Sequence, residues 1–148
     1  MKKIIGLVLV SWVWLSACQS SKITTGELDV KEAWARPAKA GDNGAAYFVI
    51  ENGTAQADRL LSAETDIASA AELHLSQMEG DHMSMHQQEA VTLPAGEAVE
   101  FSPGGFHIML VGLTRDLKNG ETFNIKLTFE RAGEKNVTVT VRDDVNDD

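Results

Sequence analysis

The chain is poor in several residue types, and each shortage excludes a class of protein. One cysteine among 148 residues excludes an internal disulfide, a cysteine-rich zinc site and a cysteine-ligated iron–sulfur cluster. Positive charge is also scarce, since 13 Lys and Arg stand against 22 Asp and Glu and give a formal net charge of −9. Without a basic cluster, nucleic acid is not an expected partner. The apolar share of 43% is enough for one core, so a single globular domain is expected.

The longest apolar run, residues 4–15, is shorter than the roughly 18 residues that a membrane-spanning helix needs. Lysines before it and small residues after it are typical of a secretory signal. The sequence Leu15-Ser16-Ala17-Cys18 also resembles the lipobox of bacterial lipoproteins, whose cysteine is lipidated and becomes the first mature residue. We therefore expect a signal peptide over residues 1–17, lipid on Cys18 and a tether over residues 18–26. The alternative is a plain signal peptide that leaves Cys18 as an unmodified thiol.

This reading predicts a protein of the periplasm or cell envelope, held at a membrane by its lipid anchor. A folded part without any thiol suits an oxidising compartment of that kind. Nothing in the sequence demands an oligomer, so a monomer is expected.

Alternation of apolar and polar residues with a period of two dominates the rest of the chain and predicts strands. The clearest pair, residues 123–130 and 137–142, is joined by a turn at 131–134. Residues 66–71 favour a single helical turn. Further short strands are expected at residues 45–51, 59–63, 71–76, 83–88, 98–101 and 106–111.

Seven to nine such strands predict an all-β fold, a Greek-key β-sandwich or barrel that forms one domain over residues 27–142. The acidic residues 143–148 are interpreted as a solvated tail.

Histidine and methionine supply the remaining metal-ligand atoms, and they are concentrated between residues 74 and 109. His107 and Met109 are two residues apart on an expected strand, so they project from the same face. His74 and Met85 lie on two other expected strands, and hairpin pairing would bring them opposite His107 and Met109. These four residues are the candidate metal ligands.

Two imidazoles and two thioethers form a soft, neutral ligand set, which favours Cu(I) over zinc, calcium or magnesium. Zinc sites use thiolate, imidazole and carboxylate, and a blue-copper centre needs a cysteine thiolate. Thioethers bind without losing a proton, so affinity should fall at low pH only as the histidines become protonated. An enzyme is not expected: Ser84, between His82 and His86, lacks the Gly-x-Ser-x-Gly context of a hydrolase.

The spacing of the four candidate ligands, with 10 residues, 21 residues and one residue between successive members, resembles the metal-binding pattern of the periplasmic PCu(A)C copper chaperones. The flanking segments Pro94-Ala95-Gly96 and 103–113 are similar too, and the resemblance covers about residues 28–142. It implies a cupredoxin-like β-barrel with an exposed Cu(I) site. It also implies a carrier that passes copper by ligand exchange to an acceptor, such as the copper subunit of cytochrome oxidase or a thioredoxin-like copper protein.

The chain departs from that family at one point, because a basic residue commonly follows the second ligand and here His86 follows Met85. His82, Met83 and His86 could therefore supply auxiliary or substitute ligands. An alternative function is a lipoprotein that scavenges or senses Cu(II) or zinc through its histidines. A further alternative is a structural β-domain in which the His and Met side chains only pack.

Residues near the candidate ligands receive structural interpretations. Trp34 and Tyr47 are expected in the core, where most aromatic residues lie. Glu72 could orient a metal ligand from outside the site, but it is interpreted as a solvated carboxylate on a strand face. Pro103-Gly104-Gly105 is expected to form a turn that lets the backbone pass close under the site rather than a phosphate loop, since no helix start follows it.

Overall fold

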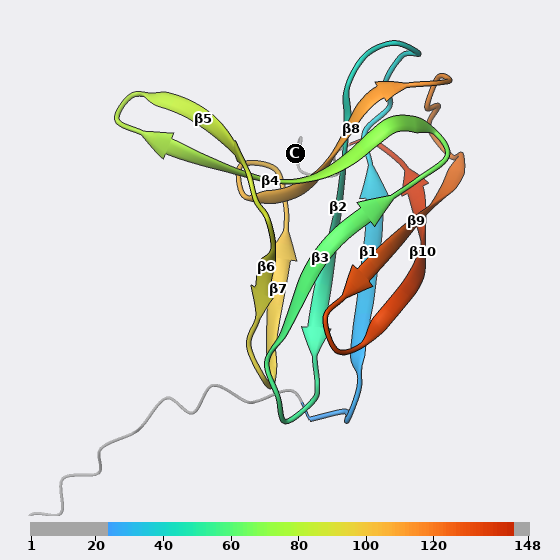
Figure 1. The fold of residues 1–148 in the computed structure, drawn as a ribbon. Coiled ribbons are helices and arrows are strands. Elements are labelled where there is room, and N and C mark those ends of the chain that lie inside the picture. Colours follow the sequence, from blue (N-terminus) through green and yellow to red (C-terminus); the bar gives the residue numbers. More distant parts are fainter. Residues whose placement is uncertain (1–23, 144–148) are drawn as a thin grey trace, which may run out of the picture.

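The computed structural model describes residues 24–143, and this part of the chain is built from strands and contains no helix (Figure 1). Within these residues there is accordingly no helix that could span a membrane. The expected signal peptide, the lipid site at Cys18 and most of the acidic tail lie outside the described residues. The strands are β1 (Leu28–Ala35), β2 (Gly44–Asn52), β3 (Asp58–Glu64), β4 (Ala68–Glu79), β5 (His82–Gln87), β6 (Val91–Leu93), β7 (Glu97–Phe101), β8 (Phe106–Leu113), β9 (Thr122–Phe129) and β10 (Gly133–Val141).

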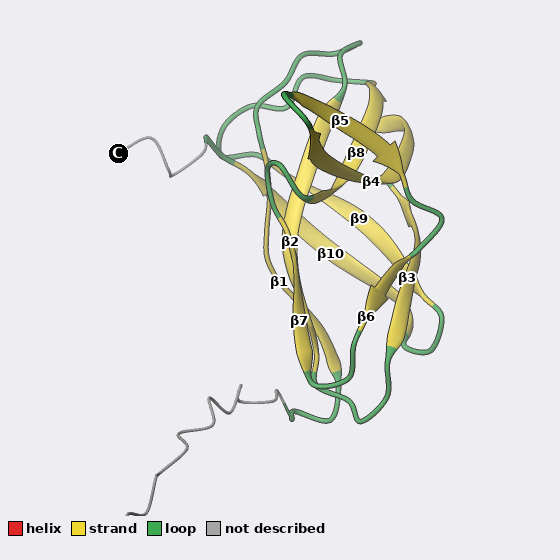
Figure 2. Ribbon diagram, turned by 90° about the vertical axis from the view of Figure 1, so that its left-hand side faces the viewer, coloured by secondary structure: helices red, strands yellow, loops and turns green. Residues whose placement is uncertain are grey.

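The ten strands form one sheet in the order β5-β4-β8-β7-β2-β1-β10-β9-β3-β6, and β8 also pairs with β2. The sheet curls so that its two halves face each other over a single apolar core (Figure 2). Two pairs, β1 with β10 and β7 with β8, run parallel, and the other pairs are antiparallel. One core supports the expectation of one all-β domain.

The β9–β10 hairpin follows directly from its residue alternation. Phe123, Ile125 and Leu127 are buried, with exposed or half-buried polar residues between them. In register, Val139 pairs with Phe123 and Val137 with Ile125, so both strands turn their apolar side chains to the core. The turn expected at 131–134 lies at residues 130–132, because β10 already begins at Gly133, which has a φ of 75°.

A β-bulge in β1 changes which of its side chains face the core. The register between β1 and β2 shifts by one residue between Lys31 and Trp34, and Glu32 takes the positive φ of 55°. Because faces alternate along a strand, one extra residue turns Ala35 inward and Trp34 outward. Ala35 is fully buried. The expectation that Trp34 lies in the core is therefore wrong: it is half-buried, and its ring lies tilted against that of Tyr47, its neighbour on the outer face of β2.

The strands differ from the sequence-based expectation in two other respects. Residues 66–71 form no helical turn, because β4 begins at Ala68 and pairs with β8 from that residue onward. The local preference of alanine for helix is weaker than the pairing and burial that a neighbouring strand supplies. In addition, β1 and the three-residue β6 were not anticipated.

The length of β2 separates the two ends of the domain. At one end, Gly53 hydrogen-bonds with Gly26 and Glu27, so the first described residues lie beside the end of β2 (Figure 1). At the other end, Ala45 pairs with Met109 of β8. The candidate ligands therefore lie at the end of the domain opposite residues 24–27.

Candidate metal centre

Strand register brings the candidate ligands to one face of the sheet. His74 on β4 lies directly opposite His107 on β8, and Glu72 lies opposite Met109. On the other side of β4, Ser76 pairs with Met85 of β5. Met85 is thus two residue pairs along the ladder from His74, in the next row on the same face, rather than opposite His107 or Met109 as the sequence suggested. The core residue Ile108 points to the other face, so the centre lies on the outer surface of the sheet.

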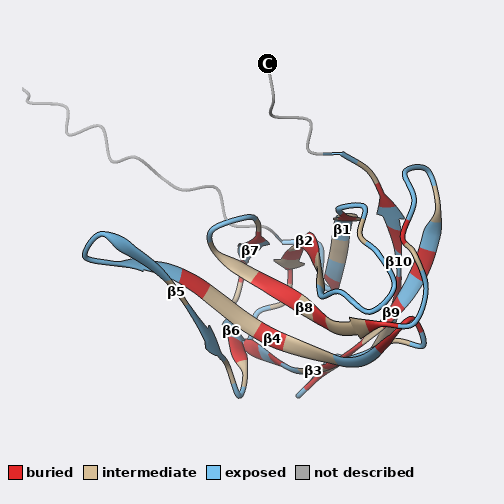
Figure 3. Cartoon of the chain, turned by 90° about the horizontal axis from the view of Figure 1, so that it is seen from above, coloured by how far each residue is buried: buried red, intermediate tan, exposed pale blue. Residues whose placement is uncertain are grey.

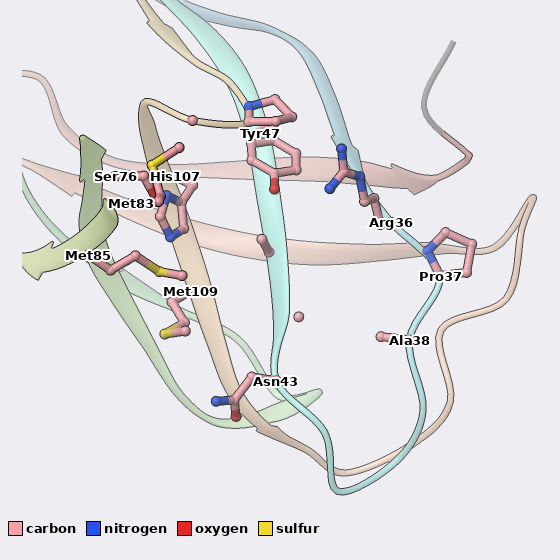
Figure 4. Close-up of a pocket in the computed structure, with 14 residues that line it drawn as sticks. Arg36, Pro37, Ala38, Asn43, Tyr47, Ser76, Met83, Met85, His107 and Met109 are labelled. Carbon is pink, nitrogen blue, oxygen red and sulfur yellow. The ribbon is translucent and has the colours of Figure 1, made fainter. Parts of the chain in front are cut away.

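A pocket of about 430 Å³ opens at this place. Met83, Met85, His107 and Met109 line one side, and Arg36, Pro37, Ala38 and Asn43 lie across from them (Figure 4). His74 is not part of the lining, but its ring centroid lies 5.8 Å from that of His107. The volume exceeds what one ion needs, which leaves room for side chains of a second protein to enter.

His107 is held so that one ring nitrogen stays available. Its Nδ1 contacts the carbonyl oxygen of Gly105 at 3.1 Å, and because a carbonyl only accepts, Nδ1 carries the proton. Nε2 of the neutral ring then keeps its lone pair. Burial lowers the pKa of His107 below its usual value of 6.5, against a smaller raising effect of the Gly105 carbonyl. A neutral imidazole is the form that binds a metal ion.

His74 also keeps one ring nitrogen available, because a carboxylate accepts a hydrogen bond from the other. Its Nε2 donates to Oε2 of Glu72 at 2.9 Å, which leaves Nδ1 as the acceptor nitrogen. Nδ1 is buried and has no hydrogen-bond partner among the described residues. A buried polar atom without a partner is costly, and a metal ion would satisfy it. Glu72 is therefore not the solvated carboxylate that the sequence suggested, because it orients His74 as an outer carboxylate orients a metal-binding histidine.

The methionine side chains near the pocket are half-buried or exposed and do not pack into the core. Met109 is half-buried, whereas Met85 is 55% and Met83 56% exposed. Met83 and Met85 are two residues apart on β5 and share a face. Of the three auxiliary candidates, only Met83 lines the pocket.

His82 and His86 project from the opposite face of the β4–β5 hairpin. Nε2 of His86 lies 2.9 Å from Oε1 of Glu79 and 3.1 Å from Oγ of Ser84. Glu79 pairs in register with His82. No cluster of three or more His, Cys, Asp or Glu side chains suited to a metal ion occurs in residues 24–143.

The loop before β2, which forms the far wall of the pocket, is fixed to the β8–β9 connection. Asp116 accepts hydrogen bonds from the backbone N–H of Ala40 and from Nζ of Lys39, both at 3.0 Å. These hydrogen bonds lower the pKa of Asp116 below its usual range, the one from the Ala40 N–H more than the one from Lys39. Asn43 accepts from the N–H of Gly112 at 2.9 Å. These contacts give the pocket a wall that the sequence did not reveal.

The turn at Pro103-Gly104-Gly105 has the role expected of it. Pro103 and Gly104 line the pocket, and Gly104 adopts a φ of 84° that a side chain would strain. The Gly105 carbonyl accepts from both His107 Nδ1 and the N–H of Ser76. The turn thus anchors His107 and joins β4 to β8 beneath the pocket.

Aromatic residues extend the row of histidines across the sheet. Trp34 and Tyr47 have ring centroids 4.7 Å apart, and Tyr47 lies 6.4 Å from His107. Tyr47 is buried and lines the pocket. No sequence signal identified this row, because it depends on the bulge that turns Trp34 outward.

Comparisons of the sequence with known proteins give matches over most of the chain. A family model described as "Putative lipoprotein LpqE-like" matches residues 28–141. A protein of Leifsonia xyli subsp. xyli, "Putative lipoprotein Lxx21020", is 29% identical over 117 residues, which cover 78% of this chain and 70% of that protein.

Solved structures have the same fold. The copper-bound PCuAC domain of PmoF2 superposes with a TM-score of 0.68 at 22% identity, covering 83% of this chain and 98% of that domain. The Cu(I)-bound solution structure of DR1885 from Deinococcus radiodurans has a TM-score of 0.64 at 30% identity, covering 85% of this chain and 87% of that one. The cupredoxin-like fold and the PCu(A)C resemblance predicted from the sequence are confirmed.

Proposed function

Because the chain belongs to the LpqE-like lipoprotein family and has the fold of PCuAC domains, we propose that it is an extracytoplasmic copper chaperone. Its cargo is Cu(I), and its ligands are His74, Met85, His107 and Met109. The proposal rests mainly on the arrangement of His74 and His107, which lie opposite each other with one acceptor nitrogen each, and on the methionines that line the pocket together with His107.

The donor set accounts for the choice of metal. Thioether sulfur is soft and uncharged, and together with imidazole it favours Cu(I). Zinc and Cu(II) are served by imidazole with carboxylate or thiolate. The alternative of a Cu(II) or zinc scavenger would rely on His82 and His86, but these project away from the pocket, and His86 contacts Glu79.

Transfer proceeds by ligand exchange in the pocket. Met85, which is 55% exposed, is the first ligand that an acceptor would displace. The space facing Arg36 and Pro37 admits the acceptor's side chains. Thiolates or imidazoles of the acceptor replace the thioethers and then the buried His107 and His74 nitrogens. Copper stays as Cu(I), and no bond of a substrate is broken, so no catalytic group is needed.

The resemblance to PCu(A)C proteins suggests the acceptor and the location. The acceptor is the copper subunit of cytochrome oxidase or a thioredoxin-like copper protein. The chain acts as a monomer in the periplasm or cell envelope, with residues 1–17 removed and Cys18 lipidated. Residues 27–142 form the copper-binding domain, and residues 143–148 are its solvated tail.

The test is Cu(I) titration of the full chain in detergent against a competing chelator, with Cu(II) and Zn(II) titrated in parallel. One Cu(I) should bind tightly, and His107→Ala or Met109→Ala should weaken it about 100-fold or more, beyond the loss expected for an outer partner. The matched control is His86→Ala, which should leave affinity unchanged. Zinc binding of equal strength that is insensitive to Met109→Ala would overturn the proposal.

A further inference from the structure

Three methionines are exposed on one face of the β4–β5 hairpin. Met78, Met83 and Met85 are 61%, 56% and 55% exposed, and the remaining large hydrophobic residue exposed among residues 24–143 is Leu61, at 37%. Methionine commonly fills gaps in a core, but these three side chains fill none. Strand β5 is the outermost strand at its end of the sheet and is exposed over nearly its whole length (Figure 3). Packing therefore does not explain the three thioethers.

Register brings the three side chains together. Met78 on β4 lies directly opposite Met83 on β5, and Met85 follows Met83 by two residues on the same face. Opposed Cβ atoms in such a ladder are about 4.5–5.5 Å apart, and diagonal neighbours lie about 7–8 Å apart, within reach of long side chains. The flexible Met side chains allow three sulfur atoms to converge on one ion.

We propose that Met78, Met83 and Met85 form a second, solvent-facing Cu(I) site, from which the ion passes into the pocket. The inference extends the proposed function, because Met83 and Met85 belong to both the hairpin cluster and the pocket lining, whereas Met78 belongs to the cluster and not to the lining. The hairpin site is the loading position, and the pocket is the holding position.

Ligand chemistry gives the two positions different affinities. The hairpin site offers three uncharged thioethers and no imidazole, so it accepts Cu(I) and rejects zinc and Cu(II). Its outward exposure makes each bond easy for water or another ligand to displace. The pocket adds two buried imidazole nitrogens, so the ion is held more tightly there.

Copper passes from the hairpin site into the pocket by ligand exchange. The bonds from copper to the Met78 and Met83 sulfurs break while bonds to Nε2 of His107, Nδ1 of His74 and the Met109 sulfur form, with Met85 bound throughout. Nε2 already carries its lone pair, because the proton of His107 is on Nδ1. Copper therefore remains Cu(I), and no proton or electron is transferred.

The other face of the same hairpin supplies the matched control. His82 and His86 lie on the same strand as Met83 and Met85 but project to the side of Glu79 and Ser84. Replacing them removes nearby metal-binding side chains and leaves the thioether face intact.

The experiment uses the full chain in detergent, loaded anaerobically from a Cu(I) chelate. The variants are Met78→Leu, which keeps size and apolarity and leaves the pocket lining intact, and His82→Gln combined with His86→Gln. With the pocket filled and Met85 held by the first ion, the wild type should bind a second, weaker equivalent of Cu(I) through Met78 and Met83 and shift their methyl NMR signals. In the methionine variant the second equivalent should disappear and loading of the first should slow about tenfold, while the affinity of the first stays unchanged. The histidine variant should match the wild type.

A methionine variant that keeps the second equivalent and the wild-type loading rate overturns the inference. So does a histidine variant that loses the second equivalent. Failure of the proposed function has a different signature, since the first equivalent would then be insensitive to His107→Ala and Met109→Ala. The two failures are therefore distinguishable in the same titrations.

Discussion

His74 and His107 lie directly opposite each other on neighbouring antiparallel strands, with ring centroids 5.8 Å apart. Each ring has one nitrogen committed to a hydrogen bond, but the partners differ. His107 donates to a backbone carbonyl, whereas His74 donates to the carboxylate of Glu72. The orientation of His107 is therefore built into the backbone, while that of His74 depends on one replaceable side chain.

Glu72→Gln should weaken Cu(I) binding about tenfold to 100-fold, because the amide is a poorer acceptor for the His74 N–H and leaves the ring less basic. Competition titration against a Cu(I) chelator measures the change, and thermal unfolding should be nearly unaffected. Glu79→Gln is the matched control, because its carboxylate also lies 2.9 Å from a histidine Nε2, that of His86, on the face away from the pocket. Equal effects from the two substitutions would contradict a role for Glu72 in positioning a ligand.

His107 should make the copper-free protein less stable as the pH falls below about 6.5. Burial lowers its pKa in the folded protein, so the unfolded chain takes up the proton first, and protonation then favours unfolding. This contribution to the unfolding free energy is complete above the unfolded pKa, declines as the pH falls toward the folded pKa, and is constant below it.

Urea unfolding between about pH 7.5 and about pH 5.5 measures the decline, and His107→Gln should remove the part that this ring causes. The His107 ring signals in the folded, copper-free protein should titrate below about 6.5 by NMR. A His107 midpoint above that value would show that the pocket stabilises the charged ring, and the explanation by burial would fail.

Asn52 should matter for stability and not for copper. It is fully buried at the far end of β2, its Nδ2 donates to the carbonyls of Gln56 and Leu93, and its Oδ1 accepts from Thr54. Asn52→Ala removes these hydrogen bonds and leaves the Leu93 carbonyl without the Asn52 donor, and should lower the unfolding free energy by about 2–3 kcal/mol. Urea unfolding measures this, with Cu(I) affinity of the folded variant unchanged.

Asn119→Ala is the control for that substitution. Asn119 is exposed and donates to Asp143 at 2.9 Å, and its loss should change the unfolding free energy by no more than about 0.5 kcal/mol. A similar cost at both positions would mean that the buried network around Asn52 contributes little.

Strands could be predicted from the sequence where one face packs in the core and the other faces solvent. Residues 123–129 and 137–141 alternate cleanly because one side of each strand packs in the core. β1 was missed because its bulge breaks the alternation at Glu32, and the same bulge misdirected the placement of Trp34. β6 has only three residues, too few for a periodic pattern. These elements depend on partners that are distant in the chain.

The candidate site could be predicted as a set of residues but not as an arrangement. Period-two spacing correctly indicates that His107 and Met109 share a face, since that relation is local. The pairing of His74 with His107, rather than with Met109, depends on the register between β4 and β8. The contact of Glu72 with His74 depends on side-chain rotamers. Met83 can be distinguished from His82 and His86 only when it is known which face of β5 meets the pocket.

Residues 24–27 and the candidate ligands lie at opposite ends of β2. Residues 24–27 lie beside Gly53, whereas Met109 pairs with Ala45 eight residues earlier on β2, a separation of about 25 Å at the rise of an extended strand. With the proposed lipid at Cys18, the metal-binding end would point away from the bilayer that holds the anchor. Copper would then be exchanged in the aqueous space at about the height of the domain above the lipid headgroups, within reach of soluble partners and of domains that project from a membrane.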